Sequence, residues 1–255
     1  MRISSVFFLG VALSLAAIAP VANATQVHIY DRVTGENLPT FRHKGRLYVA
    51  GEPGHEYEIR IHSDSQQRVL AVTSVDGVNV ISGQTSAVNQ SGYVLDPYGY
   101  TTVEGWRKNM SRTAAFYFTK LSDSYAARTG RPDNVGVIGV ALFRERTPCC
   151  QYQGELQRSD RAAEAPATSA PGYADERTRD QSNKAESKLG TGHGRSEYSA
   201  AQYTEFERAS TTPDETIVIY YDSARNLVAQ GVIPARPKYG YRLPQPFPGT
   251  FVPDP

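Results

Sequence analysis

Residues 68–81 read RVLAVTSVDGVNVI, and this stretch decides the fold class. Two runs rich in β-branched residues lie on either side of Asp76-Gly77. Both positions of an Asp-Gly pair tolerate positive φ, so the pair between two such runs is a strong short-range signal for a β-hairpin. We therefore expect Arg68–Val75 and Val78–Ile81 to be two strands joined by a tight turn.

Further strand signals follow at short intervals between residues 26 and 147. Val27 and Ile29 alternate with polar neighbours, and so do the apolar residues of 57–61. Asn134–Phe143 is nearly all apolar and is expected to be a central strand buried on both faces. The other expected strands are Tyr93–Leu95, Thr101–Trp106 and Ala114–Thr119. This pattern predicts an all-β fold, a β-sandwich of jelly-roll-like or Ig-like type, with residues 25–147 as its core.

Residues 123–131 interrupt these strands and predict one helical turn or an ordered loop. Ser122 or Asp123 would cap the turn, and Gly130 would end it. Carboxylates such as Asp76, Asp96, Glu104 and Asp222 fall mostly in expected turns, where an Asp side chain ordinarily bonds nearby backbone.

The later part of the chain divides into three segments. Residues 148–189 are polar, of mixed charge and poor in apolar residues, and predict a disordered linker. Residues 190–233 include two expected strands, Thr216–Tyr221 and Leu227–Ile233, around a turn at 222–226; they either complete the same sandwich or form a separate small domain. Residues 234–255 are rich in Pro and aromatic residues, which is typical of an unstructured tail or of a peptide ligand.

The first 24 residues have the pattern of a secretory signal peptide. Arg2 precedes an apolar run, Val6–Ala19, and Ala22-Asn23-Ala24 forms a small-x-small cleavage site. The run is too short to span a membrane comfortably, and no later run approaches spanning length. We expect a periplasmic or secreted protein with no transmembrane segment after cleavage.

Charge and cysteine content limit the classes of partner. The 27 Lys and Arg residues include Arg2, so the chain after residue 24 is formally neutral against 26 Asp and Glu. Neutrality argues against nucleic acid as a partner and does not support polybasic attachment to lipid. The two cysteines, Cys149 and Cys150, are adjacent, so they form a vicinal disulfide, link two chains as a dimer, or stay reduced.

Several segments together resemble a family of uncharacterised exported proteins of Gram-negative bacteria. The resemblance implies an exported protein and a shared fold, and it transfers no catalytic residue because no activity is established for that family. The segments that carry it are residues 74–83 (SVDGVNVISG), 92–95 (GYVL), 105–108 (GWRK), 134–143 (NVGVIGVALF), 189–194 (LGTGHG) and 220–231 (YYDSARNLVAQG).

Two groups of residues are candidates for a site. The glycines at 190, 192 and 194 surround His193 and would let a ligand approach the imidazole, with Glu197 placed to orient the ring. The alternative is a flexible loop where the linker rejoins the domain. Trp106 and Arg107, together with the many tyrosines, are candidates for an aromatic binding platform, although most aromatic residues of a sandwich pack its core.

No spacing among the five histidines matches a metal site, so we predict no metal and no cofactor. No nucleophile motif of the familiar hydrolases is present, although paired glycosidase carboxylates remain open. The sequence favours a module without catalysis that binds a protein, a peptide or a glycan. The alternatives are an envelope hydrolase using His193 and a redox-responsive assembly protein using Cys149 and Cys150.

Overall fold

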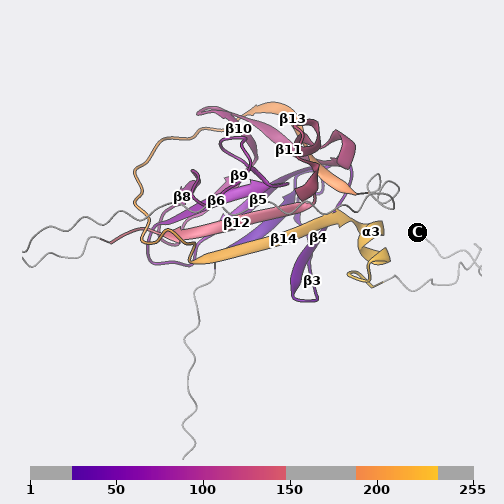
Figure 1. The fold of residues 1–255 in the computed structure, drawn as a ribbon, viewed down its shortest axis with the longest axis horizontal. Helices are drawn as coiled ribbons and strands as arrows, with labels where there is room; N and C mark the ends of the chain where they lie inside the picture. Colours follow the sequence, from indigo (N-terminus) through magenta and orange to yellow (C-terminus); the bar gives the residue numbers. More distant parts are fainter. Residues whose placement is uncertain (1–24, 148–187, 235–255) are drawn as a thin grey trace, which may run out of the picture.

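The computed structural model describes residues 25–147 and 188–234. Two β-sheets pack face to face around one large hydrophobic core, which confirms the predicted all-β sandwich (Figure 1). The expected signal peptide (1–24), Cys149 and Cys150, the linker up to residue 187 and the tail from residue 235 lie outside the described residues.

The first sheet is organised around β5, which pairs with β1 along one edge and with β9 and β11 along the other. β13 pairs antiparallel with almost the whole of β11, so residues after 188 extend a sheet built from the first part of the chain. Its strands are β1 (Gln26–Asp31), β2 (Glu36–Asn37), β5 (Glu56–His62), β9 (Tyr100–Val103), β10 (Gly105–Asn109), β11 (Arg112–Lys120) and β13 (Leu189–Tyr198).

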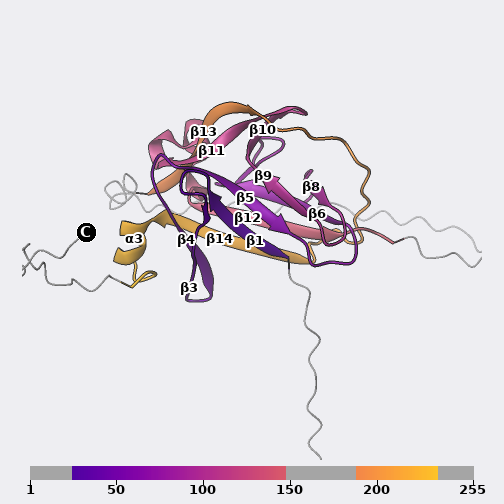
Figure 2. The same ribbon diagram turned by 180° about the vertical axis from the view of Figure 1, so that it is seen from behind.

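The second sheet is organised around β12, which lies between β6 and β14, as the apolar pattern of this segment predicts. β14 also pairs in parallel with β4, so the last strand is inserted within the sheet. The strands are β3 (Thr40–His43), β4 (Arg46–Gly51), β6 (Val69–Val75), β7 (Val78–Asn79), β8 (Tyr93–Leu95), β12 (Val137–Arg144) and β14 (Glu215–Ser223). Figure 2 shows the two sheets from behind, with β3 and β4 projecting as a hairpin.

The predicted hairpin between residues 68 and 81 is present. Asp76 and Gly77 have φ of 53° and 72°, as a tight turn with two positive φ values requires. The turn joins β6 to the short strand β7. The expected helical turn is α1 (Tyr125–Arg128), between the 3-10 turns η1 (Leu121–Asp123) and η2 (Pro132–Asn134). Its cap is Ser124, not Ser122 or Asp123, because the Ser124 hydroxyl accepts a hydrogen bond from the N–H of Ala127 at 3.2 Å.

The prediction of a second C-terminal strand at Leu227–Ile233 is wrong. The chain instead forms α3 (Ala224–Ala229) directly after β14. Ser223 caps this helix by accepting a hydrogen bond from the N–H of Asn226, and the carboxylate of Asp222 accepts one from the Asn226 side chain. Leu227 is fully buried, so one apolar contact and a local cap outweigh the strand preference of the following residues.

Aromatic rings bridge the two sheets in the middle of the core. Phe118 on β11 stacks on Tyr57 at 4.3 Å between ring centroids and lies 5.5 Å from the ring of Tyr221 on β14. All three side chains are buried. Gly51 has no side chain at this point, and a Cβ there would lie 2.7 Å from the Phe118 ring. The two sheets therefore meet through an aromatic layer that leaves no room for a side chain at residue 51.

We predict that Phe118→Ala lowers the free energy of unfolding by about 3–5 kcal/mol, because it opens a cavity between the sheets. Urea denaturation followed by Tyr and Trp fluorescence measures the change. Val33→Ala, at a side chain 62% exposed, is the control and should change stability by less than about 0.5 kcal/mol. A loss of under about 1 kcal/mol for Phe118→Ala would contradict the bridging role of the ring.

Candidate functional site

Four polar side chains form a buried group that we call the Asp76 cluster: Tyr57, Asp76, Thr191 and Tyr221. The Thr191 hydroxyl lies 2.6 Å from the hydroxyl of Tyr57 and 2.7 Å from that of Tyr221, and Tyr221 donates to Asp76 Oδ1 at 2.5 Å. A carboxylate only accepts, so its place at the end fixes the direction of donation from Tyr57 through Thr191 and Tyr221 to Asp76. The cluster joins β5 and β13 of one sheet to β14 and the β6–β7 turn of the other.

The backbone completes the hydrogen bonds of Asp76. Its Oδ1 also accepts from the N–H of Gly136, and its Oδ2 accepts from the N–H of Thr191, both at 2.9 Å. Burial nevertheless raises the pKa of Asp76 to about 6, against the lowering effect of these hydrogen bonds. A raised pKa is a common feature of active sites, but this carboxyl is fully buried, so its contacts are structural. The expectation that Asp76 bonds nearby backbone is corrected, since its acceptor bonds reach residues far along the chain.

The glycines around His193 serve packing. A Cβ at Gly192 would overlap the ring of Tyr117, and one at Gly190 would lie 2.7 Å from the side chains of Ser124 and Val135. The segment is part of β13 and not a loop. The aromatic rings and backbone of neighbouring elements, not a ligand, thus occupy the space that these glycines leave.

His193 and Glu197 are not brought together. His193 is exposed and its ring lies 5.6 Å from that of Tyr125, while Glu197 accepts a hydrogen bond from Arg32 at 2.7 Å. Among the described residues, no hydrogen bond or ion pair joins His193 to a second titratable group. The hydrolase hypothesis required such a partner, and the geometry does not support it.

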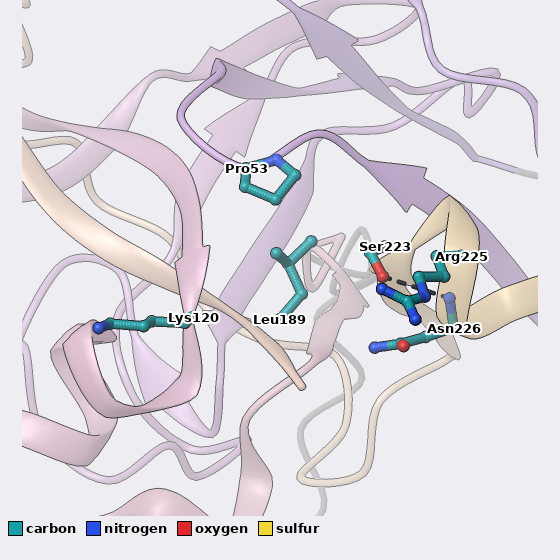
Figure 3. A pocket seen from close by; sticks show the side chains of 6 residues that line it. All are labelled: Pro53, Lys120, Leu189, Ser223, Arg225 and Asn226. Atoms are coloured by element: carbon teal, nitrogen blue, oxygen red, sulfur yellow. Dashed lines mark hydrogen bonds between the residues drawn. The ribbon is translucent and has the colours of Figure 1, made fainter. Parts of the chain in front are cut away.

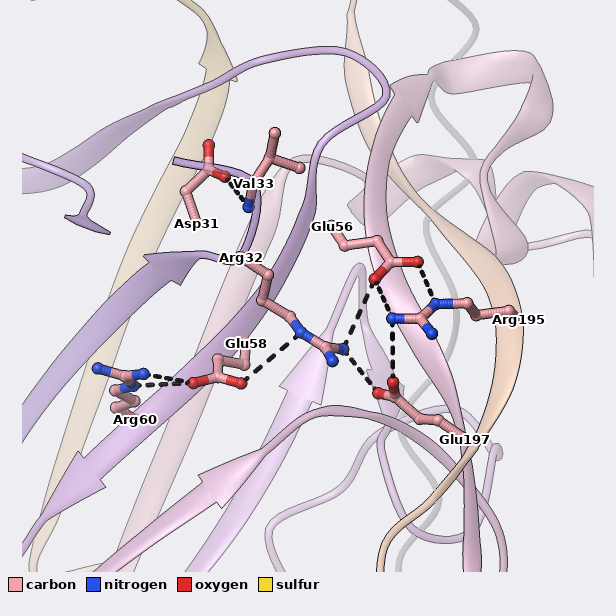
Figure 4. A network of polar contacts seen from close by, with 8 residues as sticks. All are labelled: Asp31, Arg32, Val33, Glu56, Glu58, Arg60, Arg195 and Glu197. Carbon is pink, nitrogen blue, oxygen red and sulfur yellow. Dashed lines mark hydrogen bonds and ion pairs between the residues drawn. The ribbon is translucent and has the colours of Figure 1, made fainter. Parts of the chain in front are cut away.

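Glu197 belongs to a network of alternating charges on the outside of the first sheet (Figure 4). Arg195 donates to both carboxylate oxygens of Glu56 at 2.8 and 2.9 Å, and Arg32 lies between Glu56, Glu58 and Glu197. The hydrogen bond from Arg195 lowers the pKa of Glu56 despite partial burial. A glycosidase acid needs a raised pKa, so this network has the character of structural ion pairs.

The structure separates the two residues of the expected aromatic platform. Trp106 is 4% exposed and packs edge-on against Phe116 at 5.1 Å, with Nε1 donating to the carbonyl of Gly192 at 3.4 Å. It is therefore part of the core and offers no accessible ring to a ligand. Arg107, the next residue, points to the opposite face of β10 and is half-buried.

Arg107 lines the groove that we take as the candidate site. This Arg107 groove has a volume of about 800 Å³ and lies between β8, β9 and the segment 199–208. Arg107 donates to the Tyr93 hydroxyl through Nε at 3.2 Å and Nη2 at 2.9 Å, and to the carbonyl of Ser199 at 2.6 Å. The groove is lined by Leu70, Ile81, Asn89, Gln90, Ser91, Gly92, Tyr93, Val94, Thr101, Thr102, Arg107, Met110, Ser199, Ala200, Ala201, Gln202, Tyr203, Thr204, Phe206 and Arg208.

The segment 199–208, which we call the arch, contributes side chains to the lining of the groove. Figure 1 shows this segment in orange after β13, on the path from the first sheet to β14 of the second. At one end the N–H of Ala201 donates to the carbonyl of Met110 at 2.8 Å. At the other end Phe206 packs on an apolar patch of the second sheet, and Arg208 lies 4.2 Å from the ring centre of Phe143. Tyr203, between these anchors, is 92% exposed. Sequence reasoning missed the arch because its residues show no periodicity.

A second hollow lies where β11, β13 and α3 meet (Figure 3). Its volume is about 460 Å³, and its lining residues are Pro53, Lys120, Leu189, Ser223, Arg225 and Asn226. The Ser223 hydroxyl is occupied as the cap of α3. This hollow has few polar groups that converge on one point, so the Arg107 groove is the better candidate.

In residues 25–147 and 188–234, no group of three or more His, Cys, Asp or Glu side chains is placed to hold a metal ion. Within the same ranges, no helix has the length and apolarity that a membrane span requires. Comparisons with family models, curated proteins and solved structures returned no match.

We predict that Asp76→Asn removes a pH dependence of stability between pH 7 and 5. The folded pKa of about 6 lies above the ordinary 3.8, so the folded state binds the proton more tightly. The contribution of Asp76 is thus greatest below pH 3.8 and is lost as the pH rises through 6. The unfolding free energy of the wild type, relative to Asp76→Asn, should rise by about 1–2 kcal/mol from pH 7 to pH 5.

Asn is a suitable replacement because it tolerates the positive φ of Asp76. The measurement is urea denaturation at each pH. The matched control is Asp96→Asn, which removes the same charge at a side chain 86% exposed and should follow the wild type across this range. If the free energies of unfolding of the wild type and of Asp76→Asn change in parallel with pH, the pKa of Asp76 is not raised by burial.

Proposed function

We propose that the protein is an exported module without catalysis that binds a saccharide in the Arg107 groove. The observation that carries the proposal is the chemistry of the lining. Hydroxyl, amide and tyrosine side chains line a volume of about 800 Å³, which is within the range of small-ligand sites. Export is supported by the pattern of residues 1–24.

Both arginines of the groove already donate hydrogen bonds to groups of the protein, so the groove does not require a strongly charged ligand. Arg107 is occupied by Tyr93 and Ser199, and Arg208 donates to the carbonyls of Val88 and Gln90 at 2.8 and 2.6 Å. Because Tyr93 accepts from Arg107, its own O–H remains available to donate to a ligand. Asn89, Gln202 and the threonines at 101 and 102 provide further donors and acceptors.

The lining also has few of the side chains that commonly serve as catalytic acids and bases. No Asp, Glu, His, Cys or Lys is among the residues that line the groove. Tyr93 and Tyr203 are the remaining lining residues of a type that can transfer a proton, so the chemistry of the lining favours binding over catalysis. Binding of a neutral or acidic sugar chain is the chemistry that this groove supports best.

We predict that Tyr203→Ala weakens saccharide binding roughly twofold to tenfold, because stacking on an aromatic ring contributes about 0.5–1.5 kcal/mol. A glycan array built from cell-envelope oligosaccharides finds the ligand, and titration calorimetry measures the affinity. Tyr203 is 92% exposed, so its removal leaves the core intact.

Tyr198→Ala is the matched control, since Tyr198 is 77% exposed on β13 and does not line the groove. It should bind as the wild type does. The proposal fails if no oligosaccharide binds, or if the two variants weaken binding equally. Capture of a protein or peptide at the same groove would replace the saccharide with a different ligand class.

A further inference from the structure

The hairpin of β3 and β4 carries a second surface, independent of the Arg107 groove. Its turn is Lys44-Gly45, with φ of 47° and 76°, which gives a tight and well-defined tip. Figures 1 and 2 both show the hairpin projecting from the body at the edge of the second sheet. The tip is therefore free to reach a large surface without hindrance from the rest of the molecule.

Positive charge is concentrated at this tip. Arg42, His43, Lys44 and Arg46 are within five consecutive residues, and no Asp or Glu occurs between residues 37 and 51. Arg42, Lys44 and Arg46 are exposed. Among the ion pairs of the described residues none includes these three side chains, whereas the arginines of the first sheet are paired with glutamates.

The strand register distributes the cations around the tip. His43 is opposite Arg46 on one face of the hairpin, Arg42 is opposite Leu47 on the other face, and Lys44 is in the turn. An extended peptide along one face would meet only part of this charge. A flat anionic surface approached by the tip meets all of it.

Aromatic rings flank the cations on the outer face of the second sheet. Tyr48 and Tyr220 are half-buried, with ring centroids 5.5 Å apart, and the Arg46 guanidinium lies 5.5 Å from the Tyr220 ring. Tyrosine rings beside basic side chains suit the boundary between lipid and water, because one end is apolar and the other is polar.

We propose that the β3–β4 hairpin binds an anionic lipid surface through Arg42, Lys44 and Arg46. The net charge of the chain does not reveal this basic surface, because the carboxylates that balance its charge lie elsewhere in the fold. Each Lys or Arg near an anionic membrane contributes about 1 kcal/mol, so three predict a preference of roughly a hundredfold over a zwitterionic membrane.

Vesicle co-sedimentation of the purified protein tests the proposal. Vesicles of equal parts phosphatidylglycerol and phosphatidylcholine should bind it, and vesicles of phosphatidylcholine alone should not. Binding should weaken when the salt is raised from about 0.1 M to about 1 M, because exposed charges are then screened. The double variant Arg42→Glu/Lys44→Glu should lose at least about thirtyfold in affinity.

The matched control is Lys108→Glu/Arg128→Glu, which makes the same change of net charge at two exposed positions away from the hairpin. This control should bind anionic vesicles nearly as well as the wild type, and circular dichroism should show that both variants are folded. Equal loss in the two double variants would show a general charge effect and overturn the proposal. Absence of binding by the wild type would also overturn it, and binding of an acidic peptide instead would assign the hairpin to a protein partner.

Discussion

The carboxylate of Asp76 is at the end of a chain of hydrogen bonds that passes through the interior of the sandwich. It accepts from Tyr221 and from two backbone N–H groups, and Thr191 connects Tyr221 to Tyr57 on the opposite sheet. A buried carboxylate without these partners would be strongly destabilising. The bonds from Gly136 and Tyr221 lie within the second sheet, whereas those that involve Thr191 and Tyr57 reach the first sheet. All of these groups are therefore satisfied only when the two sheets and both parts of the chain are in place together.

The surfaces with proposed functions depend on this arrangement. β13, which carries Thr191, leads into the arch that lines the Arg107 groove, and the arch leads into β14, which carries Tyr221. β14 in turn pairs with β4, the second strand of the basic hairpin. β13 and β14, which contribute Thr191 and Tyr221 to the Asp76 cluster, thus also position the groove and the hairpin.

The sequence predicts the fold class because alternation and turn chemistry are local signals. The hairpin at Asp76-Gly77 and the central strand β12 follow directly from them. The role of Asp76 does not, because Thr191, its partner, is 115 residues away and nothing in the pattern pairs the two. Helix α3 was missed because the cap at Ser223 resembles a turn. Of the residues that the sequence singles out, Arg107 lines the groove, whereas Trp106 is buried, and no hydrogen bond or ion pair within the described ranges joins His193 to a second titratable group.

The most direct test of the Asp76 cluster is a titration of the folded protein by NMR, with carbon-13 in the aspartate carboxyl groups and Asp76→Asn used to assign the signal. We expect the Asp76 carboxyl to titrate at a pH of about 6. A midpoint near 3.8, the ordinary value for an aspartate, would show that the carboxyl is in contact with water and that the sheets are not joined through it.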